Sequence, residues 1–197
     1  MRSPFILASG SQIRRKLLSQ AGVDFIVMPS DVDEDVIKTG NPDWDADALA
    51  LNLAEAKALD VSDKSPGALV LGADQVLSLD GQTHDKARSK DEARQRLIDL
   101  RGKTHRLHAS LALAKDNKIV WRFSQSSVLT VRNFSHEFLD AYLDSAGDAL
   151  TASVGCYAYE DLGAQLFERV DGEYFAILGL PLLPLLAELR ARGVVMA

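Results

Sequence analysis

The chain has a single cysteine, Cys156, among its 197 residues, which excludes an internal disulfide and any metal site built from several cysteines. A reducing cytoplasm is the compartment that fits this cysteine usage best. Long apolar runs are also missing. The N-terminal run covers only residues 5–8, too short for the core of a signal peptide, and no run approaches the length of a membrane span. We therefore expect a cytoplasmic protein without a membrane partner.

Basic charge is scarce. Lysine and arginine number 22 against 28 acidic residues, giving a formal net charge of −6. This balance argues against a nucleic-acid binder, which needs a basic face, but it leaves room for a local positive pocket that holds a nucleotide. With 47% hydrophobic and 25% charged residues, the chain is typical of a globular protein. Its length suffices for one core, or for one core split by a cleft into two lobes.

Several common catalytic motifs are absent. The four histidines show neither the H-E-x-x-H pattern nor a cysteine–histidine spacing, which argues against a zinc hydrolase. No G-x-S-x-G elbow, G-x-x-x-x-G-K-[ST] loop or G-x-G-x-x-G turn occurs, which argues against serine hydrolases, P-loop enzymes and dinucleotide-binding proteins. Cys156 is interpreted as a small buried residue rather than a nucleophile.

The strongest positive signal is the segment Leu-Ala-Ser-Gly-Ser-Gln-Ile-Arg-Arg near the N-terminus. Residues 5–8 predict a strand, and residues 12–21 predict a helix that Gly22 ends. Backbone N–H groups at the start of such a helix bind anions, and arginine side chains hold phosphate oxygens at fixed angles. The alternative is an ordinary helix start with solvated arginines. The segment predicts a polyphosphate site formed by Ser9, Ser11, Arg14 and Arg15.

Strand-like and helix-like segments alternate along the whole chain, without repeats or linkers, which favours one α/β domain over residues 1–197. Ser89 and Glu92 have the spacing of a helix-capping box. Asp80-Gly81 predicts one hairpin, and Asp171-Gly172 predicts another between strands at 166–170 and 174–178. The remaining predicted elements are strands at 25–28, 68–72, 76–79, 104–114 and 119–132, and helices at 46–58, 89–100, around 138–143 and at 182–192.

Carboxylates follow two predicted strands. Asp33 and Glu34 lie in an acidic loop, residues 31–35, after the second strand, and Asp74 lies at or just past the end of the apolar strand at 68–72. Loops beyond strand ends line the ligand crevice of an open α/β sheet, so these acids could converge with the serines and arginines. A divalent cation such as Mg²⁺ would link carboxylates to phosphates. Most acids of the loop have a simpler reading as solvated charges, whereas an acid as buried as Asp74 needs a partner.

Together these segments resemble, nearly from end to end, the Maf-like nucleoside triphosphate pyrophosphatases. The family's serine–arginine loop, acidic Asp-x-Asp-Glu loop, helical lysine and Gly-x-Asp signature are matched in that order by Ser9 to Arg15, Asp31 to Glu34, Lys57-Ala58 and Gly72 to Asp74. Further matches are Lys86, Gly102 to His105, and Gly179 to Leu182. Three positions depart: Gln12 and Ala87 replace prolines, and Ser153 replaces a lysine.

The resemblance implies an α/β fold in which a mixed, bent sheet and flanking helices form two lobes around a nucleotide-binding cleft. It implies hydrolysis of the α–β phosphoanhydride of a nucleoside triphosphate, with Mg²⁺ or Mn²⁺ as cofactor and a possible homodimer. In the expected mechanism Asp74 deprotonates the attacking water, Glu34 and Asp74 hold the metal, and Lys86 offsets charge on the leaving pyrophosphate. The expected substrate-binding residues are Ser9, Ser11, Arg14, Arg15, Lys57, Gln75 and Glu160.

Residues 74–76 and 160–169 are closer to the subgroup acting on 7-methyl-GTP than to the one acting on dTTP and UTP. The Glu160 carboxylate can accept both N1–H and the 2-amino group of guanine, whereas uracil and thymine offer one donor between two carbonyls. Alternatively, Glu160 is a solvated loop acid. Three other functions stay open: a dTTP/UTP pyrophosphatase, a nucleotidyltransferase, and a nucleotide-binding regulator linked to cell division with weak or no catalysis. The last is motivated by the altered lysine position, Ser153.

Overall fold

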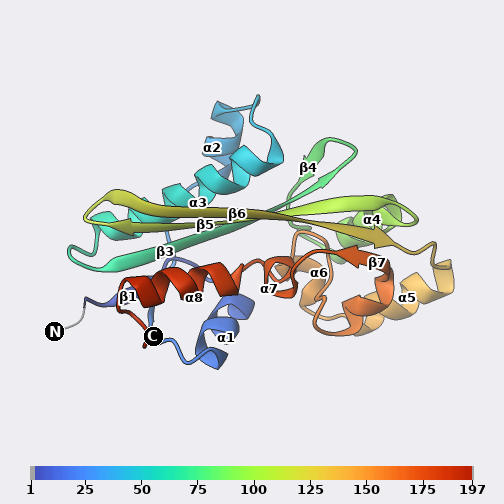
Figure 1. Ribbon diagram of the computed structural model, residues 1–197. Helices are drawn as coiled ribbons and strands as arrows, with labels where there is room; N and C mark the ends of the chain where they lie inside the picture. Colours follow the sequence, from blue (N-terminus) through green and yellow to red (C-terminus); the bar gives the residue numbers. More distant parts are fainter. Residues whose placement is uncertain (1–2, 197) are drawn as a thin grey trace.

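The computed structural model describes residues 3–196, which contain one seven-stranded mixed sheet (Figure 1). Its main path runs β2-β1-β3-β5-β6-β7, and β4 pairs with β3 at the side of this path. The short strand β1 is parallel to β2 and β3, whereas the long strand β5 is antiparallel to both of its neighbours, β3 and β6. The strands are β1 Phe5–Leu7, β2 Ile26–Val27, β3 Leu69–Leu79, β4 Gln82–His84, β5 Thr104–Lys115, β6 Lys118–Val131 and β7 Phe167–Asp171.

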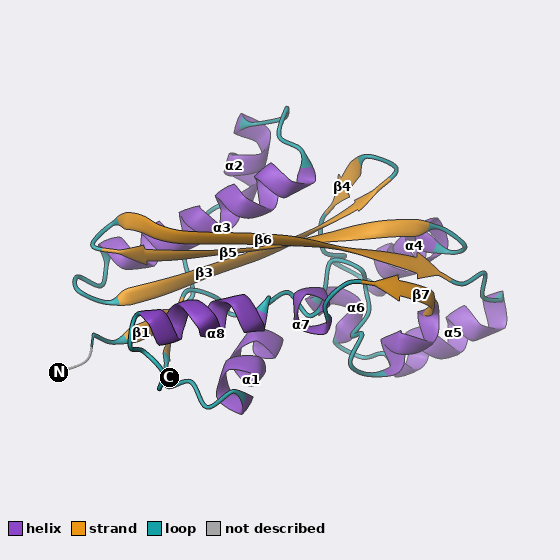
Figure 2. Cartoon of the chain, in the orientation of Figure 1, coloured by secondary structure: helices purple, strands orange, loops and turns teal. Residues whose placement is uncertain are grey.

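Helices cover both faces of the sheet. Figures 1 and 2 show α2 and α3 on one face of the long strands, and α1 and α8 on the other. The helices α4, α5 and α6 lie with β7 near the end of the long strands that is farther from β1 (Figure 1). The helical elements are α1 Gln12–Gln20, α2 Glu34–Gly40, α3 Ala46–Asp63, α4 Lys90–Leu100, α5 His136–Ser145, α6 Ala149–Ala152, the 3₁₀ helix η1 Leu162–Leu166, α7 Tyr174–Ile177 and α8 Leu182–Ala191.

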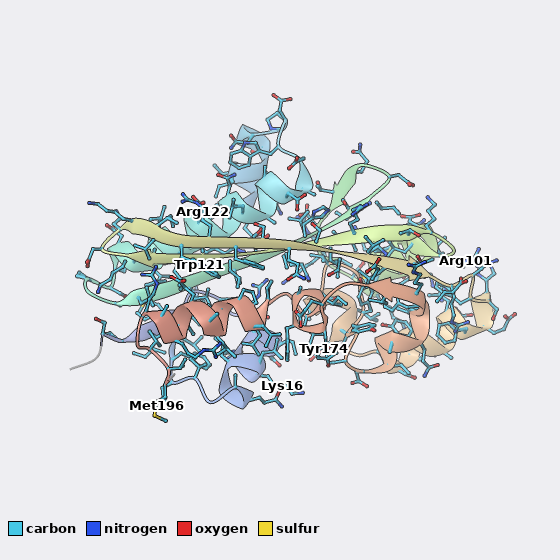
Figure 3. All side chains as sticks on the ribbon, viewed as in Figure 1. Lys16, Arg101, Trp121, Arg122, Tyr174 and Met196 are labelled. Carbon is cyan, nitrogen blue, oxygen red and sulfur yellow. The ribbon has the colours of Figure 1, made fainter. Side chains whose placement is uncertain are left out.

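The two largest apolar cores of residues 3–196 lie along the long strands, where side chains fill the space between the sheet and the helices (Figure 3). One core contains Leu71 and Leu113 and packs against α1 and α8. The second contains Leu77 and Phe134 and packs against α4 and α5. Because β3 and β5 contribute side chains to both cores, the two lobes share one continuous sheet, as expected for the cleft-bearing fold.

The prediction that Asp74 follows the end of a strand is wrong. β3 runs without a break from residue 69 to 79, paired with β5 along nearly its whole length, and Asp74 stands opposite Ser110 in the middle of it. A charged side chain is tolerated there because Lys57 of α3 pairs with it. The two apolar runs predicted as separate strands are therefore one strand.

Two further predictions need correction. The acidic segment does not stay a loop to residue 35, because Asp33 caps α2 by accepting hydrogen bonds from the backbone N–H groups of Asp35 and Val36. Residues 174–178 do not form the second strand of a hairpin. Residues 174–177 are the short helix α7, capped by Glu173, and β7 pairs with β6 instead.

Other local predictions are confirmed. The turn between β3 and β4 is made by Asp80 and Gly81, both in the left-handed region with φ of 51° and 80°. Ser89 caps α4 by accepting a hydrogen bond from the backbone N–H of Glu92.

Within residues 3–196, no helix has the combined length and apolar character that crossing a membrane requires.

Candidate active site

A cavity of about 1220 Å³ opens between the two lobes. Its wall is formed by the loop after β1, by α2 and α3, by the middle of β3, by the segment after β4, and by residues around 152–160. The structure thus brings together side chains that lie far apart in the sequence. Of the predicted site residues, all but Arg15 line it: Ser9, Ser11, Arg14, Glu34, Lys57, Asp74, Gln75, Lys86 and Glu160.

The serines of the N-terminal loop shape the backbone at the mouth of α1. Ser11 caps the helix by accepting a hydrogen bond from the backbone N–H of Arg14 at 3.4 Å. The Ser9 hydroxyl accepts hydrogen bonds from the backbone N–H of Ser11 and from Nη1 of Arg14, at 3.2 and 3.1 Å. The predicted strand–loop–helix arrangement is confirmed, with the helix start facing the cavity.

Arg14 ties three segments of the site together. Its Nε donates to the carbonyl of Gly179 and its Nη1 to the carbonyl of Ala73, both at 2.9 Å. Gly179 has a φ of +82°, a conformation that side-chain-bearing residues rarely adopt, and so presents its carbonyl to the arginine. Burial lowers the pKa of Arg14, while the charges of Asp74 and Glu34 act in the opposite direction. Much of its donor capacity therefore serves the protein itself.

Arg15 lies differently from its neighbour. Its Nη2 donates to the carbonyl of Gly10 at 3.4 Å, and it is not among the residues that line the cavity within the described chain. Successive helical residues point about 100° apart, so both arginines cannot face one site equally. A role for Arg15 in substrate binding stays a prediction.

The centre of the site is a row of alternating charges. Nζ of Lys57 lies 2.6 Å from Oδ1 of Asp74 and 2.7 Å from Oε1 of Glu34. Although partial burial acts to raise it, the pKa of Glu34 is lowered by the contact with Lys57 and by the charge of Lys38. Asp74 is buried, at 7% exposure, so its carboxylate needs an ion-pair partner such as Lys57.

The row continues with two residues that sequence reasoning missed. Nζ of Lys38, one helical turn beyond Glu34, lies 3.7 Å from Oε2 of Glu34 and 2.5 Å from Oδ1 of Asp85. The spacing of four between Glu34 and Lys38 is informative only once residues 34–40 are known to be helical. Asp85 directly precedes Lys86 in the segment after β4.

Lys86 is positioned by this segment. Burial lowers the pKa of Lys86, and the positive charge of Arg14 lowers it further. Arg96 of α4 fixes the segment: its Nη1 donates to the carbonyls of Asp85 and Val154, each at 2.9 Å. No motif pointed to Arg96, because its role depends on two carbonyls that are distant in sequence.

One side of the cavity is formed by the loop in which Ser153 replaces the lysine of the family pattern. Ser153 closes this loop on itself: its hydroxyl donates to the carbonyl of Tyr157 at 2.7 Å and accepts from the Tyr157 backbone N–H at 2.9 Å. The Tyr157 hydroxyl bonds Nε2 of His105 at 2.7 Å, and burial lowers the pKa of His105 to about 4, which keeps the ring neutral at pH 7. Burial raises the pKa of Cys156 to about 11, so it is a buried thiol rather than a nucleophile, as predicted.

Two predicted residues border this side. Nε2 of Gln75 donates to the carbonyls of Ala176 and Ile177, both at 3.0 Å, so its amide nitrogen anchors α7. Glu160 lines the cavity and is exposed. The predicted site residues other than Arg15 therefore line one cavity in the structure.

The residues present fit a hard divalent cation. Asp74 and Glu34 contact the same ammonium group, so their oxygens lie within reach of one ion. Within residues 3–196, no group of three or more histidine, cysteine or acidic side chains could hold a metal ion alone. This arrangement suits Mg²⁺, which takes one or two carboxylates and completes its shell with water and phosphate oxygens.

Comparison with known proteins places the chain. Residues 4–192 match the family model described as Maf-like protein. A protein of Maricaulis maris (strain MCS10), named nucleoside triphosphate pyrophosphatase, is 58% identical over 190 residues, covering 96% of this chain and 97% of that protein. A protein of Brucella abortus biovar 1 (strain 9-941), named 7-methyl-GTP pyrophosphatase, is 44% identical over 194 residues, covering 96% of each. A solved HAM1 protein from Coxiella burnetii is 15% identical, with a TM-score of 0.43 over 67% of this chain and 74% of that one. On the strength of the family match and the two sequence relatives, the chain belongs to the Maf family.

Proposed function

We propose that this protein is a nucleoside triphosphate pyrophosphatase that cleaves its substrate in the cavity between the two lobes. Relatives that are 44% and 58% identical over nearly their whole length carry pyrophosphatase names. The observation that carries the proposal is the row Asp74–Lys57–Glu34 in the cavity wall, where a buried carboxylate and a second carboxylate share one ammonium group.

The charge of the cavity wall supports a need for a divalent cation. A triphosphate brings several negative charges, and the wall already holds more acidic than basic side chains. The acidic ones are Asp33, Glu34, Asp35, Asp74, Asp85, Asp148 and Glu160, and the basic ones are Arg14, Lys16, Lys38, Lys57, Lys86 and Arg88. Bound at Glu34 and Asp74, Mg²⁺ or Mn²⁺ would neutralise phosphate charge and polarise the α-phosphate. Lys57 would keep its contact with Oδ1 of Asp74 and could also donate to phosphate oxygens, because an ammonium group carries three N–H donors.

The residues of the chain then divide the reaction between them. Water attacks the α-phosphorus, the bond from that phosphorus to the bridging oxygen breaks, and the electron pair leaves with pyrophosphate. Lys57 contacts Oδ1 of Asp74, so Oδ2 is the atom proposed to take the proton of the water. Lys57 and Lys86 offset the charge that develops on pyrophosphate, and Arg14 contributes a fixed positive charge behind the loop.

Base recognition is proposed for Glu160, which supports a guanine-type substrate such as 7-methyl-GTP. Its carboxylate only accepts hydrogen bonds, and guanine offers two adjacent donors. A positively charged 7-methylated ring would strengthen the pairing. The name of the Brucella relative agrees with this choice, whereas the name of the Maricaulis relative specifies no base.

The reaction is tested by incubating the purified protein with a panel of nucleoside triphosphates and Mg²⁺ or Mn²⁺. We expect equal amounts of nucleoside monophosphate and pyrophosphate, and no conjugate with a second acceptor, which a nucleotidyltransferase would leave. Release of inorganic phosphate and a nucleoside diphosphate would contradict cleavage at the α–β bond. The absence of turnover on every member of the panel would favour a binding role.

The substrate choice is tested with Glu160→Gln. We expect the wild-type protein to have a higher kcat/KM for 7-methyl-GTP than for dTTP or UTP. The glutamine variant should narrow this preference by about 1–3 kcal/mol, the usual cost of a polar group that the bound base covers and leaves unpaired. Asp161→Asn, an exposed neighbour outside the cavity lining, is the matched control. Unchanged ratios in Glu160→Gln would remove Glu160 from base recognition.

A further inference from the structure

The ion pair between Lys38 and Asp85 crosses the edge of the cavity. Both residues line the cavity, Lys38 from α2 and Asp85 from the segment after β4, and Nζ of Lys38 lies 2.5 Å from Oδ1 of Asp85. The pair joins the two segments that carry Glu34 and Lys86. It therefore lies beside the charges to which the proposed function assigns the metal and the leaving pyrophosphate.

The pair is not needed to hold either segment in place. The segment after β4 is fixed by Arg96, which donates to the Asp85 backbone carbonyl whatever the Asp85 side chain does. On the other side, Asp33 caps α2, and Ile37 packs against the apolar cluster formed by α3 and Val76. The side chains of Lys38 and Asp85 are thus redundant as structural anchors.

Separating Lys38 from Asp85 also costs little free energy. The Asp85 side chain is 64% exposed, so its carboxylate stays well hydrated when the lysine leaves it. Ion pairs with this much solvent contribute little, commonly below about 1 kcal/mol. A phosphate with more than one negative charge is a stronger partner for an ammonium group than one solvated carboxylate. Lys38 has a long flexible side chain that is 25% exposed and can exchange one partner for the other.

We propose that Lys38 is a further substrate-binding residue, whose ammonium group leaves Asp85 and binds a phosphate of the triphosphate. Asp85 then acts as a placeholder that keeps Lys38 extended along the cavity edge before the substrate arrives. The proposal rests on the proposed function for the identity of the substrate, but its chemistry concerns only polyphosphate binding. Lys38 lies one carboxylate beyond Lys57 in the row of charges, so it extends the phosphate-binding surface away from Asp74.

The test measures the binding of inorganic tripolyphosphate in the presence of Mg²⁺ by calorimetry. Lys38→Met should weaken binding by about tenfold or more, because a charged hydrogen bond to phosphate is lost. Asp85→Asn should leave the affinity unchanged or raise it by up to about fivefold, because the competing partner is removed. The two substitutions break the same ion pair, and the proposal expects only Lys38→Met to weaken binding.

A purely structural role of the ion pair predicts a different pattern. If the pair only holds the cavity edge together, both substitutions should weaken binding to the same degree, and this result would overturn the proposal. Failure of the wild-type protein to bind tripolyphosphate would also overturn it. Lys38→Arg keeps the charge and should retain most of the affinity, which separates lost charge from poor folding. Lys103→Met, which breaks the exposed Lys103–Asp80 pair outside the cavity, is the matched control and should bind normally.

The outcome is independent of catalysis. A wild-type protein that binds tripolyphosphate but hydrolyses no nucleoside triphosphate would contradict the proposed function and leave the role of Lys38 standing. If the wild-type protein hydrolyses nucleotides and Lys38→Met binds tripolyphosphate as tightly as the wild type, the proposed function stands and the role of Lys38 is contradicted.

Discussion

Replacing Asp74 with asparagine tests the proposed chemistry most directly. The amide has the same shape and keeps the packing in the middle of β3, but it cannot take a proton from water and is a poor metal ligand. Loss of a general base typically lowers the rate about 10²–10⁴-fold, which corresponds to about 3–5 kcal/mol in the activation barrier. We expect a fall in kcat of that size for Asp74→Asn.

The structure also bounds the cost to stability. Removing one partner of a buried ion pair can cost about 3–5 kcal/mol because the other charge is left alone. Here Lys57 keeps Glu34 at 2.7 Å, and the asparagine oxygen can still accept from its ammonium group. The free energy of unfolding should therefore fall by less than about 2 kcal/mol. We therefore expect Asp74→Asn to lose most of its activity while it stays folded.

The assay measures pyrophosphate release over time on the best substrate of the panel, with urea unfolding of the same samples. Asp80→Asn is the control, because Asp80 is a turn residue with positive φ, a conformation that asparagine adopts readily, and its ion pair with Lys103 is exposed. The control should be as active as wild type. An Asp74→Asn protein that turns over within a few-fold of wild type would show that Asp74 is not the base.

Two further predictions concern the scaffold of the site. Arg14→Ala should lower the free energy of unfolding by about 2–4 kcal/mol, because two buried carbonyls lose their donor. It should also weaken the binding of every nucleoside triphosphate to the same degree. Arg15→Ala should change the free energy of unfolding by less than about 1 kcal/mol. Equal losses of stability in urea unfolding would contradict the distinction between the two arginines. Gly72→Ala should destabilise the fold by more than about 2 kcal/mol, because the added Cβ would lie 2.0 Å from the Ala54 carbonyl oxygen of α3. Gly40→Ala is the control: its added Cβ has no atom within 4 Å, so its melting temperature should stay close to that of the wild-type protein. A stable Gly72→Ala protein would mean that α3 can move away from the sheet.

Local signals predicted the elements whose causes lie within a few residues. Ser11 and Ser89 mark the starts of α1 and α4 because a capping side chain bonds backbone N–H groups two or three residues away. The Asp80-Gly81 turn followed from the conformational freedom of its two residues. By contrast, residues 31–35 are predicted as a loop, because no local signal distinguishes the capping carboxylate of Asp33 from its acidic neighbours.

By itself, the sequence determined the α/β class, the strand–loop–helix segment that begins with β1, and nine of the residues that line the cavity. These depend on residue type and on matches to a family pattern. Only the tertiary structure decided how those residues meet. β3 became one strand because β5 pairs with it along nearly its full length, and this pairing sets Asp74 against Lys57 of α3 rather than at a strand end. The contacts of Arg14, Arg96 and Lys38 likewise join segments that are distant along the chain, and no local pattern encodes a partner that only folding brings within hydrogen-bonding distance.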